Sequence, residues 1–201
     1  MGTAERILIS IGVDGISIDT PSLKLASPFT PASTGVSDIP LPRAVWAPQG
    51  GTYSGLVVPR DGGRPYHLVA ALTPEAKLAP TRWGKPEKMD HVFSEWDGFA
   101  NTAAILEADP ENVIANRIRA LSVSGHSDWY WPSMLESAVM YANIGDLVRQ
   151  FLGTWGAWIS AQHPDYPSDA YVQYFVYGFQ DWDRKGVEFG AVAVRRVYSD
   201  L

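Results

Sequence analysis

Isoleucines at alternate positions near the N-terminus predict a β-hairpin. They occupy every second position in residues 7–11 and again in 16–18, on either side of a Val-Asp-Gly turn at 13–15. Residues 26–44 are rich in serine, threonine, proline and glycine, which predicts an extended proline-rich arm. A small hairpin buries little surface alone. We therefore expect residues 1–48 to be an N-terminal docking arm that packs against another chain or against the rest of this one.

Residues 49–201 have the patterning of a globular domain. Apolar runs at 53–58 and 66–72, separated by proline and glycine, predict two strands. After residue 151 the chain consists of short β segments rich in aromatic residues. Helical patterns lie between these two groups of strands. Strands, then helices, then strands predict an α+β fold rather than an alternating α/β fold.

Three helices are predicted in the middle of the chain. The first covers residues 97–106. An N-cap aspartate at position 109, followed by proline, predicts a second helix over residues 110–121. An S-x-x-E capping box opens a third helix, predicted over residues 133–145 and ending near a glycine.

Composition and charge exclude several classes of protein. The 201 residues include no cysteine, which excludes a disulfide scaffold, a thiol nucleophile and cysteine-ligated metals. A net charge of −6 and the lack of a long basic run argue against a nucleic-acid partner. Apolar runs fall far short of the roughly 20 residues that span a bilayer, so we expect no membrane insertion. We expect neither a signal peptide nor a cofactor.

An ordered series of motifs extends through the second half of the chain. It reads D-G-F-A-N-T at 97–102, G-H-S-D-W-Y-W-P-S at 125–133, W-G-A-W-I-S at 155–160 and A-V-A-V-R-R-V at 191–197. This series resembles the DUF1566 (Lcl C-terminal) family, which includes phage and prophage members and is related to C-type-lectin-like folds. The resemblance covers about residues 49–201 and implies a C-type-lectin-like domain.

The chain departs from the family pattern at three places. Trp131 replaces the usual leucine, Trp158 is followed by isoleucine rather than serine, and Tyr171 stands where tryptophan is common. Each change keeps a bulky or β-forming residue, so the expected fold is unchanged. The related sulfatase-modifying enzymes depend on cysteines and are excluded. The E-P-N, Q-P-D and W-N-D motifs of calcium-dependent lectins are also lacking.

Aromatic residues concentrate between residues 151 and 182 and suggest a binding face. On a strand at 170–177 alternate side chains share a face, and we expect Phe175 to point inward and Tyr174 outward. Exposed tyrosine and tryptophan among short polar groups are typical of binding faces. The candidate receptor-binding residues are Gln162, His163, Tyr166, Asp169, Tyr174, Gln180, Trp182 and Arg184. The alternative is a solvated or intersubunit surface.

Other polar residues favour structural roles. His126, Ser127 and Asp128 are adjacent, so their side chains should diverge rather than form a triad, and Asp128 is expected to accept backbone hydrogen bonds. No catalytic residue is assigned. The histidines are isolated and no metal site is assigned, although loop carboxylates at 165–183 leave calcium binding open.

Two further groups are expected to stabilise the fold. Trp129 and Trp158 should pack in the core. Arg195 and Arg196 should anchor the last strand through ion pairs.

These features lead to one expected function and one alternative. We expect a non-enzymatic phage virion protein of the tail fibre, spike or baseplate, with a receptor that is a host-surface glycan or protein. Residues 1–48 would contact other virion proteins, and the chain would be a homo-oligomer, with a trimer expected by analogy with tail fibres. The alternative is a structural decoration or cement protein of the virion with no receptor role.

Overall fold

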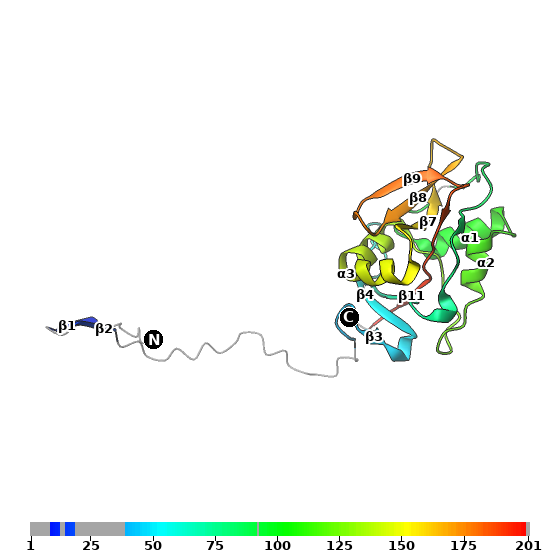
Figure 1. Ribbon diagram of the computed structural model, residues 1–201. Helices are drawn as coiled ribbons and strands as arrows, with labels where there is room; N and C mark the ends of the chain where they lie inside the picture. The colour runs from blue at the N-terminus through cyan, green and yellow to red at the C-terminus, as the bar shows by residue number, and fades with distance from the viewer. Residues whose placement is uncertain (1–8, 13–14, 19–38, 92, 200–201) are drawn as a thin grey trace. The chain divides into compact units, whose positions relative to one another are not determined.

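The computed structural model describes residues 9–12, 15–18, 39–91 and 93–199, and the chain divides into two compact units, Met1–Val36 and Ser37–Leu201 (Figure 1). In the first unit β1 (Ile9–Gly12) and β2 (Gly15–Ile18) pair antiparallel. This pairing confirms the predicted hairpin. Residue 7, turn residues 13–14 and residues 26–38 of the predicted arm lie outside the described residues.

Residues just before position 48 belong to the second unit. β3 (Val45–Trp46) pairs with β4 (Gly51–Val57) across a 3-10 turn, η1 (Ala47–Gln49). Trp46 is buried, and its ring lies 5.5 Å from that of Tyr53. The boundary predicted at residue 48 therefore falls inside the second unit, because β3 supplies part of its sheet and core.

The second unit is α+β, as predicted. Its larger sheet has the order β11–β5–β4–β3, with β5 at Tyr66–Ala70 and β11 at Val194–Val197. A three-stranded sheet has the order β7 (Gly156–Gln162), β8 (Asp169–Tyr174) and β9 (Gln180–Arg184). The short strands β6 (Thr81–Arg82) and β10 (Glu188–Phe189) pair with each other, and η2 (Pro74–Ala76) is a 3-10 turn. The strands predicted at 53–58 and 66–72 correspond to β4 and β5.

The helices occur where the sequence predicts them, but the second begins later and the third ends later than predicted. α1 (Gly98–Ala108) begins after Asp97, whose side chain accepts a hydrogen bond from the Ala100 amide. α2 spans Val113–Arg119 and is capped by Asn112, not by Asp109. Asp109 instead ends α1, because its amide donates to the Ile105 carbonyl at 2.7 Å.

α3 (Met134–Leu152) is longer than predicted. The predicted capping box is present at Ser133 and Glu136. The helix does not end near Gly145: the backbone departs from helical geometry at Ile144 and then continues to a left-handed Gly153. α3 packs against β4 of the larger sheet and against β7 and β8 of the smaller one (Figure 1). No helix among the described residues is long and apolar enough to cross a membrane.

Tryptophans fill the core beside α1 and α2. Trp83, Trp129, Trp131 and Trp158 are all essentially inaccessible to solvent and belong to one cluster. Each indole nitrogen donates to a backbone carbonyl, so no ring buries an unsatisfied N–H. The core positions predicted for Trp129 and Trp158 are confirmed. A second cluster joins α3 to the two main sheets.

A buried polar network links the last strand to the helices. Glu136 Oε1 accepts hydrogen bonds from the hydroxyls of Tyr66 (2.6 Å) and Tyr130 (2.5 Å). Arg196 Nη2 lies 3.3 Å from the same oxygen and 2.7 Å from Asp97 Oδ1. Burial raises the pKa of both tyrosines, and the Glu136 charge adds to the rise. The polar groups of the network are each other's hydrogen-bond and ion-pair partners. Since these groups come from different elements, the network links β5, β11, α1 and α3.

Candidate functional site

His163 organises the loop between β7 and β8. The side chain is 7% exposed, and its backbone amide donates to the Asp169 carbonyl at 2.9 Å. Its Nδ1 accepts hydrogen bonds from the amides of Asp165 and Tyr166, each at 3.1 Å. These bonds require the tautomer with hydrogen on Nε2. The imidazole therefore holds the loop rather than contacting solvent.

Three aromatic rings surround the His163 imidazole. Ring centroids of Tyr166 and Trp182 lie 4.6 and 4.7 Å from it, and that of Tyr171 stacks at 5.6 Å. Tyr166 and Trp182 also stack on each other at 6.4 Å with an interplanar angle of 23°. We call His163, Tyr166, Tyr171 and Trp182 the aromatic cluster.

The outer rings of the aromatic cluster are open to solvent. Tyr166 is 54% exposed and Trp182 is 46% exposed. Tyr171 is half-buried, and burial raises the pKa of its hydroxyl, with the carboxylates of Glu95 and Asp165 adding to the rise. The cluster thus presents two ordered rings on a buried imidazole, a surface suited to stacking on a flat or ring-shaped partner.

Gln162 does not lie on an exposed loop. It is 4% exposed at the end of β7, where its Oε1 accepts from the Met89 amide (3.1 Å) and from Lys185 Nζ (2.9 Å). Its Nε2 donates to the Met89 carbonyl at 2.8 Å. The expectation that Gln162 and His163 join an exposed binding face is wrong for both side chains, because each is used to hold neighbouring segments together.

Tyr174 does not point outward. On β8 the buried Ala170 and Val172 share its face, and Tyr174 packs half-buried on the same core. Its ring lies 5.1 Å from Phe179 and 5.8 Å from Phe189. Alternation fails as a guide because β8 ends at Tyr174, after which the chain turns and buries Phe175 as predicted.

The remaining predicted site residues take no part in the ring contacts of the aromatic cluster. Gln180 is half-buried, and its Nε2 donates to the Met134 carbonyl at 2.7 Å and to Gln173 Oε1 at 2.9 Å. Asp169 and Arg184 are opposed in the β8–β9 register beside the aromatic cluster. Of the eight predicted residues, the structure brings His163, Tyr166 and Trp182 into mutual ring contact.

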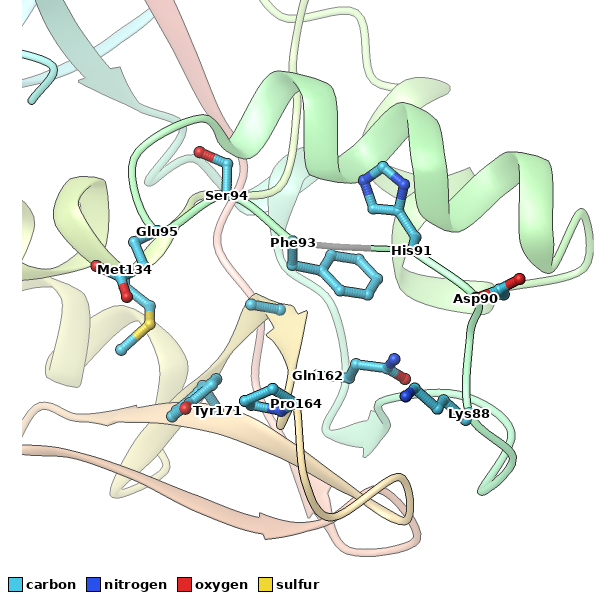
Figure 2. A pocket seen from close by; sticks show the side chains of 11 residues that line it. Lys88, Asp90, His91, Phe93, Ser94, Glu95, Met134, Gln162, Pro164 and Tyr171 are labelled. Atoms are coloured by element: carbon cyan, nitrogen blue, oxygen red, sulfur yellow. The ribbon is translucent and has the colours of Figure 1, made fainter. Parts of the chain in front are cut away.

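A cleft borders the aromatic cluster and was not anticipated from the sequence. Its volume is about 290 Å³, and it separates the loop before α1 from β7 and β8 (Figure 2). The residues that line it are Lys88, Asp90, His91, Phe93, Ser94, Glu95, Met134, Ala161, Gln162, Pro164 and Tyr171. Tyr171 belongs to both the aromatic cluster and the cleft, because its ring stacks on His163 and also lines the cleft. The only signal in the sequence was an aromatic residue, Phe93, within a polar loop.

A second exposed aromatic group lies at the other end of β8. Trp155 and Tyr177 are 68% and 61% exposed, and Tyr177 stacks on Phe179 at 5.8 Å. The Trp155 carbonyl accepts a hydrogen bond from the Phe175 amide. Three residues of β8 follow Tyr171 of the aromatic cluster before the strand ends at Tyr174, a length of about 10 Å at roughly 3.3 Å per residue.

Neighbouring polar residues near position 127 serve the fold. His126 Nε2 donates to the Pro48 carbonyl at 2.8 Å, whereas both Asp128 oxygens accept from Arg195 at 2.8 and 2.9 Å. The predicted divergence of these side chains is confirmed, as are the ion pairs of Arg195 and Arg196. The main partner of Asp128 is a guanidinium rather than the expected backbone amides. Within the described ranges, no group of three or more histidine or acidic side chains could hold a metal ion.

Comparison with known proteins adds no relative. A scan against protein-family models finds no match to this chain. A search of curated proteins likewise finds no match. The resemblance to the DUF1566 family stays an expectation from the motif residues of the sequence.

Proposed function

We propose that this protein is a non-enzymatic attachment protein of a phage virion, whose C-type-lectin-like body binds a host-surface glycan or protein through the aromatic cluster. One observation carries the proposal: Tyr166 and Trp182 stay about half exposed although both rings are held against a buried His163. The phage-type motifs of the sequence support the fold and the virion location.

The physical basis of attachment would be ring stacking by a pre-ordered surface. Aromatic rings supply a large contact area at low conformational-entropy cost, and rings already ordered in the free protein lose little more on binding. Several copies on one particle would add avidity without any new contact. In this proposal residues 1–48 attach the chain to other virion proteins, and the assembled form is a homotrimer.

Replacing Tyr166 and Trp182 together by alanine should abolish particle adsorption and leave the fold intact. Both rings are half exposed, so truncation should cost well under the roughly 3–5 kcal/mol of a buried aromatic deletion. Each ring at an interface centre can contribute about 2 kcal/mol or more to binding. Particles carrying the variant chain would be assayed for adsorption to host cells, and the isolated protein for its melting temperature.

The matched control replaces Trp155 and Tyr177, which are at least as exposed but lie at the far end of β8. This control should adsorb normally. Normal adsorption by the Tyr166/Trp182 variant would contradict the proposal. Failed particle assembly with that variant, while its isolated chain binds cells normally, would instead favour a decoration or cement protein.

A further inference from the structure

We propose that the cleft beside the aromatic cluster binds one amino-sugar unit of the target glycan, with its ammonium group at Glu95 and its ring between Phe93 and Tyr171. This assignment rests on the proposed function, because it takes the ligand to be part of a surface glycan. It adds a subsite of defined chemistry that neither Tyr166 nor Trp182 lines.

The size of the cleft suits a single ring. Its volume of about 290 Å³ is just below the range for drug-sized small-molecule sites, roughly 300–1,000 Å³. Figure 2 shows Phe93 on the side of the loop before α1, facing the side formed by Tyr171, Pro164 and Gln162. Small-molecule sites typically combine such apolar walls with a few polar groups that fix orientation.

The distribution of charge along the cleft favours a cation at one end. Lys88 and Asp90, which carry opposite charges, lie toward the same end of the cleft in Figure 2, so these two side chains give that end no net charge. Glu95 lies at the opposite end beside Met134, and it is the single charged side chain there among the lining residues. A ligand ammonium at this end gains a charge-assisted hydrogen bond and the attraction of nearby aromatic faces.

A backbone hydrogen bond holds the loop that carries Glu95, and the charge of Glu95 acts on the hydroxyl of Tyr171. The Glu95 carbonyl accepts a hydrogen bond from the Leu135 amide at 2.9 Å, which holds the loop against the start of α3. The carboxylate is near enough to Tyr171 to help raise the pKa of that hydroxyl. The Tyr171 ring is itself fixed by stacking on His163, so the wall is ordered before any ligand arrives.

The experiment compares three sugars that share one ring and differ in charge. The purified full chain would be titrated at pH 6 with D-glucosamine, D-glucose and D-glucuronate, and binding followed by NMR. Glucosamine should bind in the millimolar range, glucose about tenfold more weakly, and glucuronate not detectably up to about 50 mM. Equal binding of the cation and the anion, or no response to glucosamine, would overturn the assignment.

Variants test the roles of the named residues. Glu95→Gln should weaken glucosamine binding about tenfold and bring its affinity to that of glucose. Phe93→Ala should remove binding of both sugars. Glu75→Gln changes one charge on an exposed turn outside the cleft and should change nothing, and melting temperatures would show that all variants are folded. A Glu95→Gln protein that binds glucosamine normally would also overturn the assignment.

Failure of this inference can be separated from failure of the proposed function. If no amino sugar binds but replacement of Tyr166 and Trp182 still abolishes adsorption, the attachment function stands and the cleft assignment is wrong. If glucosamine binds through Glu95 but adsorption does not depend on the aromatic cluster, the subsite stands and the proposed attachment surface is wrong.

Discussion

At the scale of single residues, Lys185 is the most unusual side chain of the second unit. It has no solvent-exposed surface, and its Nζ donates to the Glu87 carbonyl (2.9 Å) and to Gln162 Oε1 (2.9 Å). The ammonium also lies 4.9 Å from the centre of the Trp83 ring. These partners are neutral, so burial lowers the pKa of Lys185 to about 8.

The free energy of unfolding should rise between pH 8 and pH 9.5. In this window the unfolded chain keeps the Lys185 proton, with a pKa of about 10.4, while the folded chain loses it. Stability increases with pH wherever the unfolded state binds more protons, and the expected gain is about 1–2 kcal/mol. Urea unfolding at a series of pH values measures it.

Lys185→Met should flatten this rise, whereas Lys88→Met, at an exposed lysine, should leave it unchanged. Above about pH 10 the free energy of unfolding should instead fall as the pH rises, for a different reason. Burial raises the pKa of Tyr66 and Tyr130 in the folded state, so the unfolded state loses protons first and stability falls. A rise that persists unchanged in Lys185→Met would show that another group causes it.

At the scale of elements, two glycines in and after α3 differ in whether they end the helix. Gly145 lies inside the helix, one residue after the distortion at Ile144, whereas Gly153 ends the helix with φ of 69°. No atom lies within 4 Å of the position where a Cβ on Gly153 would be. A side chain there would therefore meet backbone strain but no steric clash.

Gly153→Ala should lower the free energy of unfolding by about 1 kcal/mol, because a left-handed conformation costs an L-residue roughly that amount. Gly153→Asn should cost less, since asparagine adopts this conformation more readily. Chemical denaturation of both variants gives the comparison. Equal losses of stability in the two variants would indicate that steric contact of the new side chain, rather than the backbone angle, sets the cost.

At the scale of the whole molecule, the second unit contains its own core. Among the residues whose burial the structure describes, those that build both hydrophobic clusters lie at or after position 39. β3 and Trp46 belong to this core although they precede the boundary predicted from composition. The structural boundary lies at Val36 and Ser37.

Deleting residues 1–36 should leave the melting temperature of the second unit within about 2 °C of that of the full chain. Deleting residues 1–48 should lower it by roughly 10 °C, because loss of the buried Trp46 costs about 3–5 kcal/mol. Calorimetry of the two truncated chains tests both statements. Equal melting temperatures would show that β3 does not contribute to the core.

Local sequence signals were sufficient for several elements. The isoleucine alternation predicted the N-terminal hairpin, the capping box at Ser133 and Glu136 predicted the start of α3, and the pattern of apolar residues predicted an α+β fold. These features depend on neighbours a few residues away, so the chain alone determines them.

Only the tertiary structure decided which side chains reach the surface. The burial of Gln162 and Tyr174, and the cleft between Phe93 and Tyr171, depend on segments far apart in the sequence. Alternation along β8 shows which residues share a face. It does not show that the hydrophobic core covers the face of Tyr174, or that on the other face Tyr171 stacks on His163. Burial is a property of the packed elements together, and for that reason a pattern along one strand could not determine it.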